Sequence, residues 1–118
     1  MPRRGDDFSR GYTPAYGDLV HLNWNPALGS EMIDPHYGLV LSQTNFNIAT
    51  GLAVITPITS KVGKVSGFEL EIISNNVNGV AVLSQFRTFD YQVRSVQYEA
   101  TISESLIAEA VRRVKLIF

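Results

Sequence analysis

The chain has 118 residues, of which 45% are hydrophobic and 18% are charged, and its formal net charge at pH 7 is −1. These values are typical of a lightly charged globular protein with a modest core, and they argue against a protein that coats nucleic acid by bulk charge. Because the chain has no cysteine and only two histidines, disulfides and a cysteine nucleophile are excluded, and a structural zinc site is not expected.

Most of the chain has the pattern of short strands. Residues 17–24 alternate between apolar and polar side chains, which is the period of a half-buried strand, and we interpret His21 as structural or as part of a dimer interface. Pro57 cannot donate to a strand ladder, so we expect its strand to stop or bulge there. Strands separated by Gly- and Asn-rich breaks at this spacing predict a small, strongly bent antiparallel sheet or barrel. Further strands are expected over residues 37–42, 51–58, 68–72 and 79–86.

The last segment, residues 101–118, changes to a helical period. Thr101 followed three residues later by Glu104 fits a capping box, and Ser103 is the alternative N-cap. Basic side chains in the last turns complement the helix dipole, and we interpret them as structural. The apolar face comprises Leu106, Ile107, Ala110, Val111 and Val114, and the basic residues are Arg112, Arg113 and Lys115.

The sequence contains no internal repeat, low-complexity segment or domain boundary. We expect residues 1–11 to be a flexible N-terminal segment and residues 12–118 to form a single domain. There is no run of 18 apolar residues, and the start lacks the apolar stretch of a signal peptide. We therefore expect a cytoplasmic protein with no membrane partner.

Polar side chains gather at the ends of the expected strands rather than within them. A bent sheet can bring strand ends to one rim, where functional residues tend to lie on a rigid scaffold. An imidazole, a carboxylate, hydroxyls and a few cations suit acid–base work on a phosphodiester, and they predict no metal site and no cofactor. If the four cations of the central region converge, they could hold a short anionic ligand, but not a long duplex. The strand-end residues are Ser30, Glu31, Asp34, His36, Thr59, Ser60, Lys61, Gln85 and Arg87, and the four cations are Lys61, Lys64, Arg87 and Arg94.

Each of these residues also has a plain structural interpretation. His36 can be an ordinary polar residue at the start of a strand, and Glu31 can be a solvated or capping carboxylate in its turn. Thr59 and Ser60 can simply make turn hydrogen bonds after the proline. The residues alone leave both interpretations open.

Five short motifs run in one order along the chain: "YTPAYGDL" (12–19), "NPALGSE" (25–31), "VLS" (40–42), "TPITS" (56–60) and "GVAVLSQFRT" (79–88). Together they resemble the MazF/PemK toxins of type II toxin–antitoxin systems. The resemblance implies a mainly β (α+β) fold, a small and strongly bent antiparallel SH3-like barrel with a C-terminal α-helix. It also implies a homodimer that cuts single-stranded RNA without a metal, leaving a 2′,3′-cyclic phosphate and a 5′-hydroxyl. The implied protein partner is a cognate antitoxin with a flexible acidic segment.

The family's working residues carry over only where this chain matches its motifs. Glu31 matches the glutamate of the family's "GSE" motif, and Thr59 matches the threonine that contacts the reacting phosphate. Gln85 matches the glutamine of an Asp-Gln pair whose aspartate is replaced here by Ser84. The family's arginine, its usual acid–base or charge-stabilising group, falls on His36.

That departure changes the mechanism that the resemblance implies. Histidine, with an unperturbed pKa of about 6.5, can remove the 2′-OH proton or protonate the leaving 5′-oxygen, whereas arginine is a permanent cation. We therefore predict that His36, Thr59 and Glu31 are catalytic. RNA binding is predicted for Ser60, Lys61, Lys64, Gln85 and Arg87.

Three classes of function stay open at the level of sequence. The first is a metal-independent endoribonuclease toxin that cuts messenger RNA at selected sequences. The second is a toxin of the same fold that inhibits a protein target such as DNA gyrase, and the third is a catalytically inactive RNA- or protein-binding module. The missing arginine weighs against the first class, and the ordered match around Glu31, Thr59 and Gln85 supports it.

Overall fold

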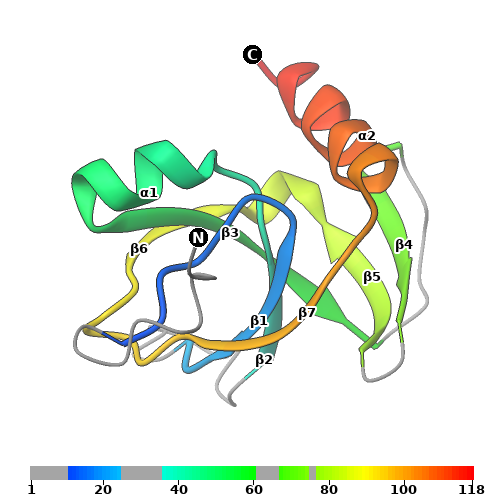
Figure 1. Ribbon diagram of the computed structural model, residues 1–118. Coiled ribbons are helices and arrows are strands. Elements are labelled where there is room, and N and C mark those ends of the chain that lie inside the picture. The colour runs from blue at the N-terminus through cyan, green and yellow to red at the C-terminus, as the bar shows by residue number, and fades with distance from the viewer. Residues whose placement is uncertain (1–10, 25–35, 61–66, 75–76) are drawn as a thin grey trace.

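A computed structural model describes residues 11–24, 36–60, 67–74 and 77–118, and within these ranges a curled antiparallel sheet is flanked by two helices (Figure 1). The strand order is β4-β5-β3-β2-β1-β7, and β6 pairs with β3. The predicted strongly bent sheet with a C-terminal helix is confirmed. The elements are β1 (Asp18–Leu22), β2 (His36–Val40), α1 (Thr44–Thr50), β3 (Leu52–Thr59), β4 (Glu69–Ile73), β5 (Asn78–Val82), the 3₁₀ turn η2 (Leu83–Gln85), β6 (Arg87–Asp90), β7 (Gln97–Thr101) and α2 (Glu104–Lys115).

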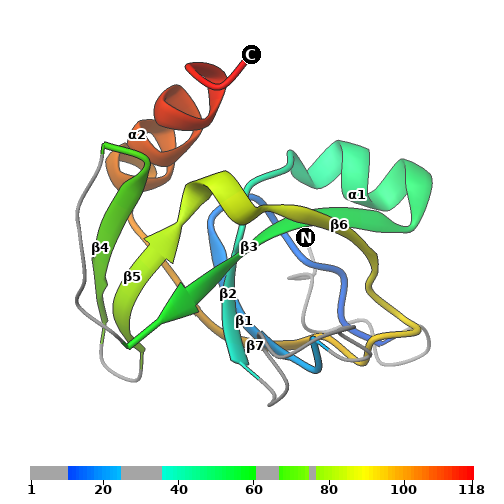
Figure 2. The same ribbon diagram turned by 180° about the vertical axis from the view of Figure 1, so that it is seen from behind.

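Strand β3 is central because three strands pair with it (Figure 2). One edge of β3 pairs with β2, and the other edge pairs first with β6 and then with β5. Thr56 and Pro57 lie where this second edge passes from β6 to β5, and the buried Thr56 hydroxyl donates to the carbonyl of Val82. The expected stop at Pro57 is therefore wrong. The strand continues to Thr59 because the proline lies in a gap of the ladder that requires no N–H donor on that edge.

Alternation along the strands sends side chains into two cores on opposite faces of β1 and β2. Leu19 lies in the first core, which α2 covers with Ile107 and Ala110. Val20, the next residue, lies in the second core together with Trp24, Phe89 and Tyr91. The second core also contains Phe89, against whose ring two arginines described below lie.

Several predicted boundaries need correction. The strand expected over 79–86 ends at Val82 because the chain turns into η2, and α1, β6 and β7 were not predicted. The N-cap of α2 is Ser103, whose side chain accepts a hydrogen bond from the backbone N–H of Leu106. Thr101 instead ends β7, where its hydroxyl donates to the buried carboxylate of Asp18 over 2.9 Å. The capping-box interpretation is therefore wrong, and the alternative cap is confirmed.

Two predictions concern segments rather than elements. Of the expected N-terminal segment 1–11, residues 1–10 lie outside the described residues. The described helices include none that is long and apolar enough to cross a membrane.

Candidate functional site

The first residue of β2, His36, and the last residue of β3, Thr59, meet at one end of the sheet. Backbone pairing between these strands joins Tyr37 with Ile58. Continuing that register by one residue puts the backbone of His36 opposite Thr59, and directly opposed residues in an antiparallel pair have Cα atoms about 4.5–5.5 Å apart. The two predicted catalytic positions are therefore neighbours across the β2–β3 ladder.

The position of Thr59 is fixed by a close approach of β5. Thr59 pairs with Val80, and a Cβ added at Gly79 would lie 2.5 Å from the carbonyl oxygen of Thr59. Only glycine allows this approach without moving the backbone. Gly79 is thus a positioning residue that the sequence analysis missed. Its signal was a glycine at the start of the strand expected over residues 79–86.

The remaining predicted catalytic and binding residues are described only in part. Ser60 directly follows β3 and is exposed, beside Thr59 in the chain. Glu31, Lys61 and Lys64 lie outside the described residues. Their predicted roles in catalysis and RNA binding therefore stay predictions.

Gln85 and Arg87 lie at the turn between β5 and β6, and both are exposed. Arg87 pairs with Ile55 of β3, so its side chain shares the face of β3 to which Ile55 and Thr59 belong. Arg87 and Thr59 are separated along this face by four residues of β3, or about 13 Å at the rise of an extended strand. One face of the sheet therefore carries a predicted catalytic residue and a predicted RNA-binding cation.

Arg87 shares an aromatic partner with Arg94, which comes from the segment between β6 and β7. The Cζ atoms of Arg87 and Arg94 lie 4.9 Å and 5.3 Å from the centroid of the Phe89 ring. Phe89 is 2% exposed and meets Trp24 edge to face, with centroids 5.0 Å apart. The Nη1 atom of Arg94 donates to the carbonyl of Asn23 over 3.4 Å. Of the four central cations whose convergence the sequence left open, the two that are described, Arg87 and Arg94, lie against the same ring.

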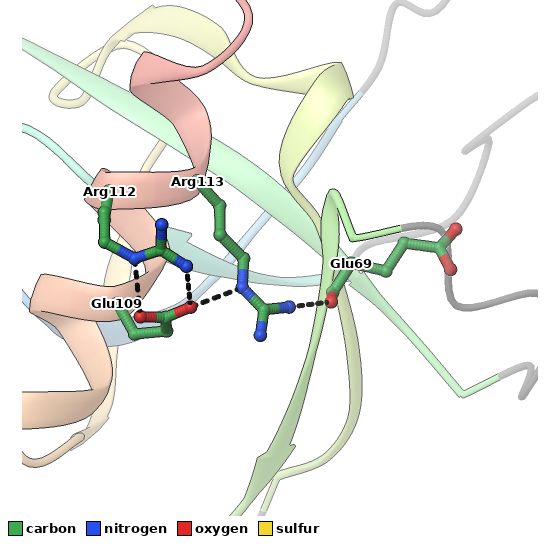
Figure 3. A network of polar contacts seen from close by, with 4 residues as sticks. All are labelled: Glu69, Glu109, Arg112 and Arg113. Atoms are coloured by element: carbon green, nitrogen blue, oxygen red, sulfur yellow. Dashed lines mark hydrogen bonds and ion pairs between the residues drawn. The ribbon is translucent and has the colours of Figure 1, made fainter.

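The arginines of α2 have a different environment (Figure 3). Arg112 binds the carboxylate of Glu109 through Nε and Nη2 at 2.9 Å and 2.8 Å, and Arg113 binds it through Nε at 2.6 Å. Hydrogen bonds from both guanidinium groups lower the pKa of Glu109 to about 2. Arg113 also donates from Nη1 to the carbonyl of Glu69 over 2.8 Å, which fastens α2 to β4. These contacts support the structural interpretation of the α2 cations.

His21 packs edge to face against Tyr37, with ring centroids 5.2 Å apart. It is half-buried in the middle of β1, which supports its structural interpretation. Across the described ranges, no three side chains of the metal-binding types gather closely enough to hold a metal ion.

Comparison with known proteins agrees with this fold and its sequence motifs. Residues 15–118 match the family described as the PemK-like, MazF-like toxin of type II toxin–antitoxin systems. Because the match covers most of the sequence, the chain belongs to this family.

Individual relatives give the same result. The endoribonuclease toxin MazF of Escherichia coli K12 is 28% identical over 92 residues, which cover 78% of this chain and 82% of that protein. The crystal structure of MazF from Deinococcus radiodurans is 31% identical and superposes with a TM-score of 0.79, covering 90% of this chain and 96% of that one. A MazE–MazF crystal structure from the same organism is 28% identical, with a TM-score of 0.75 and coverage of 90% and 95%.

Proposed function

We propose that the protein is the toxin of a type II toxin–antitoxin pair and that it cleaves single-stranded RNA at the β2–β3 end of the sheet. The observation that carries this proposal is the register that sets the His36 backbone opposite Thr59. It supports the proposal because the two positions come from separate strands and are those that the sequence motifs align with working residues of the family. The Escherichia coli relative, an endoribonuclease toxin, supports the same reaction class.

The proposed chemistry needs only side chains. The ribose 2′-oxygen attacks the adjacent phosphorus, the bond from phosphorus to the 5′-oxygen breaks, and the products carry a 2′,3′-cyclic phosphate and a 5′-hydroxyl. His36 serves as the acid–base group, removing the 2′-OH proton or protonating the leaving oxygen. The Thr59 hydroxyl donates to a phosphate oxygen whose charge grows in the transition state.

The other predicted residues complete this proposal. Glu31 orients the imidazole or shares the proton transfer, and the cations and amide neutralise and orient the RNA chain. These binding residues are Ser60, Lys61, Lys64, Gln85 and Arg87. We expect the protein to act as a homodimer in the cytoplasm, with an antitoxin as its inhibitor. The MazE–MazF crystal structure from Deinococcus radiodurans supports that partner.

The test is cleavage of a long single-stranded RNA in EDTA, with the ends of the products identified chemically. We expect wild type to leave cyclic-phosphate ends and His36→Ala to lose about 10²- to 10⁴-fold in kcat, as for removal of an acid–base group. Thr59→Ala should lose about 10²- to 10³-fold, as for removal of a transition-state hydrogen-bond donor. Thr88→Ala is the control, because Thr88 pairs with Val54 towards the other end of β3, and its loss should leave cleavage unchanged.

Each alternative result has a definite meaning. Equal cutting by wild type and His36→Ala would keep the enzyme and reject the imidazole mechanism. Failure of wild type to cut any RNA, while its expression still arrests growth, would reject RNA cleavage and favour a protein target. If wild type neither cuts RNA nor arrests growth, the toxin assignment itself is wrong.

A further inference from the structure

Two arginines from different segments lie against one aromatic ring on the Thr59 face of the sheet. The Cζ atoms of Arg87 and Arg94 are 4.9 Å and 5.3 Å from the Phe89 centroid. The separation of the two Cζ atoms is therefore at most the sum of these two distances. The ring is buried and held edge to face by Trp24. A rigid ring therefore holds two cations together at the start of β6.

An aromatic partner does not itself use the N–H donors of a guanidinium, although Nη1 of Arg94 also donates to the carbonyl of Asn23 over 3.4 Å. The ring attracts the cation through its quadrupole, whereas the five N–H donors of arginine point outward in the guanidinium plane. Arg87 is exposed, and no carboxylate in the described ranges pairs with it. Asp90, the nearest acid along the chain, accepts hydrogen bonds from the backbone of Gln92 and Val93, both at 3.2 Å. That carboxylate is therefore engaged by the turn after β6.

We propose that Arg87 and Arg94 form a phosphate-binding subsite for the RNA backbone, with Phe89 as its positioning residue. This inference rests on the proposed RNA cleavage. Planar guanidinium groups bind phosphate oxygens bidentately, and two of them on one ring provide donors for one phosphate or for two successive phosphates. The exposed amide of Gln85 lies at the adjoining turn and adds a further donor and acceptor. We name this group of Arg87, Phe89 and Arg94 the arginine clamp.

The distance between the clamp and Thr59 determines what the clamp contributes. About 13 Å of β3 separates the Arg87 position from Thr59 on the same face. The clamp therefore binds a phosphate other than the one that reacts. It holds the RNA in both the ground state and the transition state, so losing it raises KM and leaves kcat unchanged.

The experiment compares clamp variants with a control arginine in cleavage and in binding. The probe is a short RNA that contains a mapped cut site, together with an uncleavable copy carrying a 2′-deoxy sugar at that site. We expect Arg94→Gln and Arg87→Gln each to raise KM and the Kd of the uncleavable copy about tenfold or more, with kcat within about twofold of wild type. Each variant should also reduce the salt dependence of binding by about one counterion. Arg112→Gln, which removes the same charge from α2, should change none of these values.

A second set of probes locates the phosphate. Single phosphates of the RNA are replaced in turn by uncharged methylphosphonate. At one or two positions away from the cut, the replacement should weaken binding to wild type but not to Arg94→Gln. Phe89→Leu should reproduce the rise in KM, because leucine keeps the core apolar but removes the ring. Phe89→Tyr, which keeps the ring and adds one hydroxyl group, should have a KM close to that of wild type. Arg94→Lys is a milder substitution that replaces Arg94→Gln if that variant does not fold. We expect its KM and its Kd for RNA to lie between those of wild type and those expected for Arg94→Gln.

Several outcomes would overturn the clamp while leaving the enzyme intact. These are a wild-type KM in the folded Arg94→Gln or Arg94→Lys variant, a loss of kcat rather than affinity, or a methylphosphonate effect only at the cut. Weakened binding of an acidic antitoxin peptide with unchanged RNA binding would also reject it. If wild type cuts no RNA, the proposed function fails, and the clamp is then tested by binding of an unmodified single-stranded RNA: a Kd for Arg94→Gln equal to that of wild type would reject it.

Discussion

The two pairs of arginines in this protein have opposite partners. On α2, Arg112 and Arg113 share the carboxylate of Glu109, whereas Arg87 and Arg94 share the ring of Phe89. A carboxylate neutralises one of the two charges and occupies N–H donors, whereas a ring attracts the cations without neutralising them. Arg94 in addition donates from Nη1 to the carbonyl of Asn23. The comparison teaches that equal charge on two surfaces does not imply equal capacity for an anion. The partner of each arginine decides its role.

The two pairs of arginines also differ in the parts of the fold that they contact. Arg113 extends from Glu109 to the backbone of β4, so the α2 pair joins two elements of the fold. The clamp pair instead lies against a buried ring of the second core through its guanidinium groups. The first arrangement serves stability, and the second presents charge on the face that carries Thr59.

The largest expected effect comes from removing the ring. Phe89→Ala should lower the free energy of unfolding by about 3–5 kcal/mol, because a fully buried aromatic side chain is replaced by a cavity next to Trp24. Urea unfolding followed by tryptophan fluorescence measures this loss. Phe89→Tyr, which keeps the ring, should lose much less. Equal stability of the alanine and tyrosine variants would show that the ring does not anchor the second core.

The second prediction separates the reaction centre from the clamp. Gly79→Ala would place a Cβ 2.5 Å from the Thr59 carbonyl oxygen, so the β3 backbone must move, at a cost of about 1–3 kcal/mol. We expect kcat to fall while KM for RNA stays unchanged, which is the reverse of the clamp variants. Val82→Ala is the control, because it shortens a side chain on the same strand at a position that pairs with Glu69 and not with Thr59. A normal kcat in folded Gly79→Ala would contradict the role given to Thr59.

The sequence was sufficient for the features that depend on local pattern. Runs and alternation of apolar residues predicted β1 to β5 but not β6 or β7, and the helical period predicted α2. Motif order placed Thr59 at a strand end, as observed. By contrast, α1 is a seven-residue helix without a side-chain cap, and its Phe46 and Ile48 are exposed, so it carries no amphipathic signal.

The sequence could not predict those parts of the site in which the fold brings separate segments of the chain together. Nothing local relates Arg94 to Arg87, since they meet only because the chain reverses after β6 and comes back across Phe89. The His36–Thr59 pairing likewise depends on the β2–β3 register, which motif order cannot supply. Pro57 misled for a related reason. Its missing N–H matters only if a neighbouring strand accepts a hydrogen bond there. Pro57 lies between the part of β3 that pairs with β6 and the part that pairs with β5, so no such bond is required.

A smaller effect should appear when the carboxylate of the α2 pair is removed. Glu109→Gln should release two guanidinium groups and strengthen sequence-independent binding to a polyanion such as heparin, so that elution requires more salt. Glu104→Gln is the matched control, because it removes the same charge from the same helix at a position without an arginine partner in the described chain. Equal elution of the two variants would mean that total charge, and not the partner, sets the affinity.

The smallest effect concerns stability against pH. The pKa of Glu109 lies at about 2, below its ordinary value of 4.5, because Arg112 and Arg113 donate hydrogen bonds to the carboxylate. A carboxyl group with a lowered pKa in the folded state stabilises the protein above its unfolded pKa, and this contribution is lost as the pH falls through the folded pKa. The difference in urea midpoint between wild type and Glu109→Gln should therefore be constant from pH 7 to about pH 5 and shrink towards pH 2. Raising the salt concentration should reduce it, since the ion pairs are at the surface. A difference that persists unchanged at pH 2 would mean that Glu109 stabilises α2 by packing, and the contrast between the carboxylate-bound and ring-bound arginines would lose its electrostatic basis.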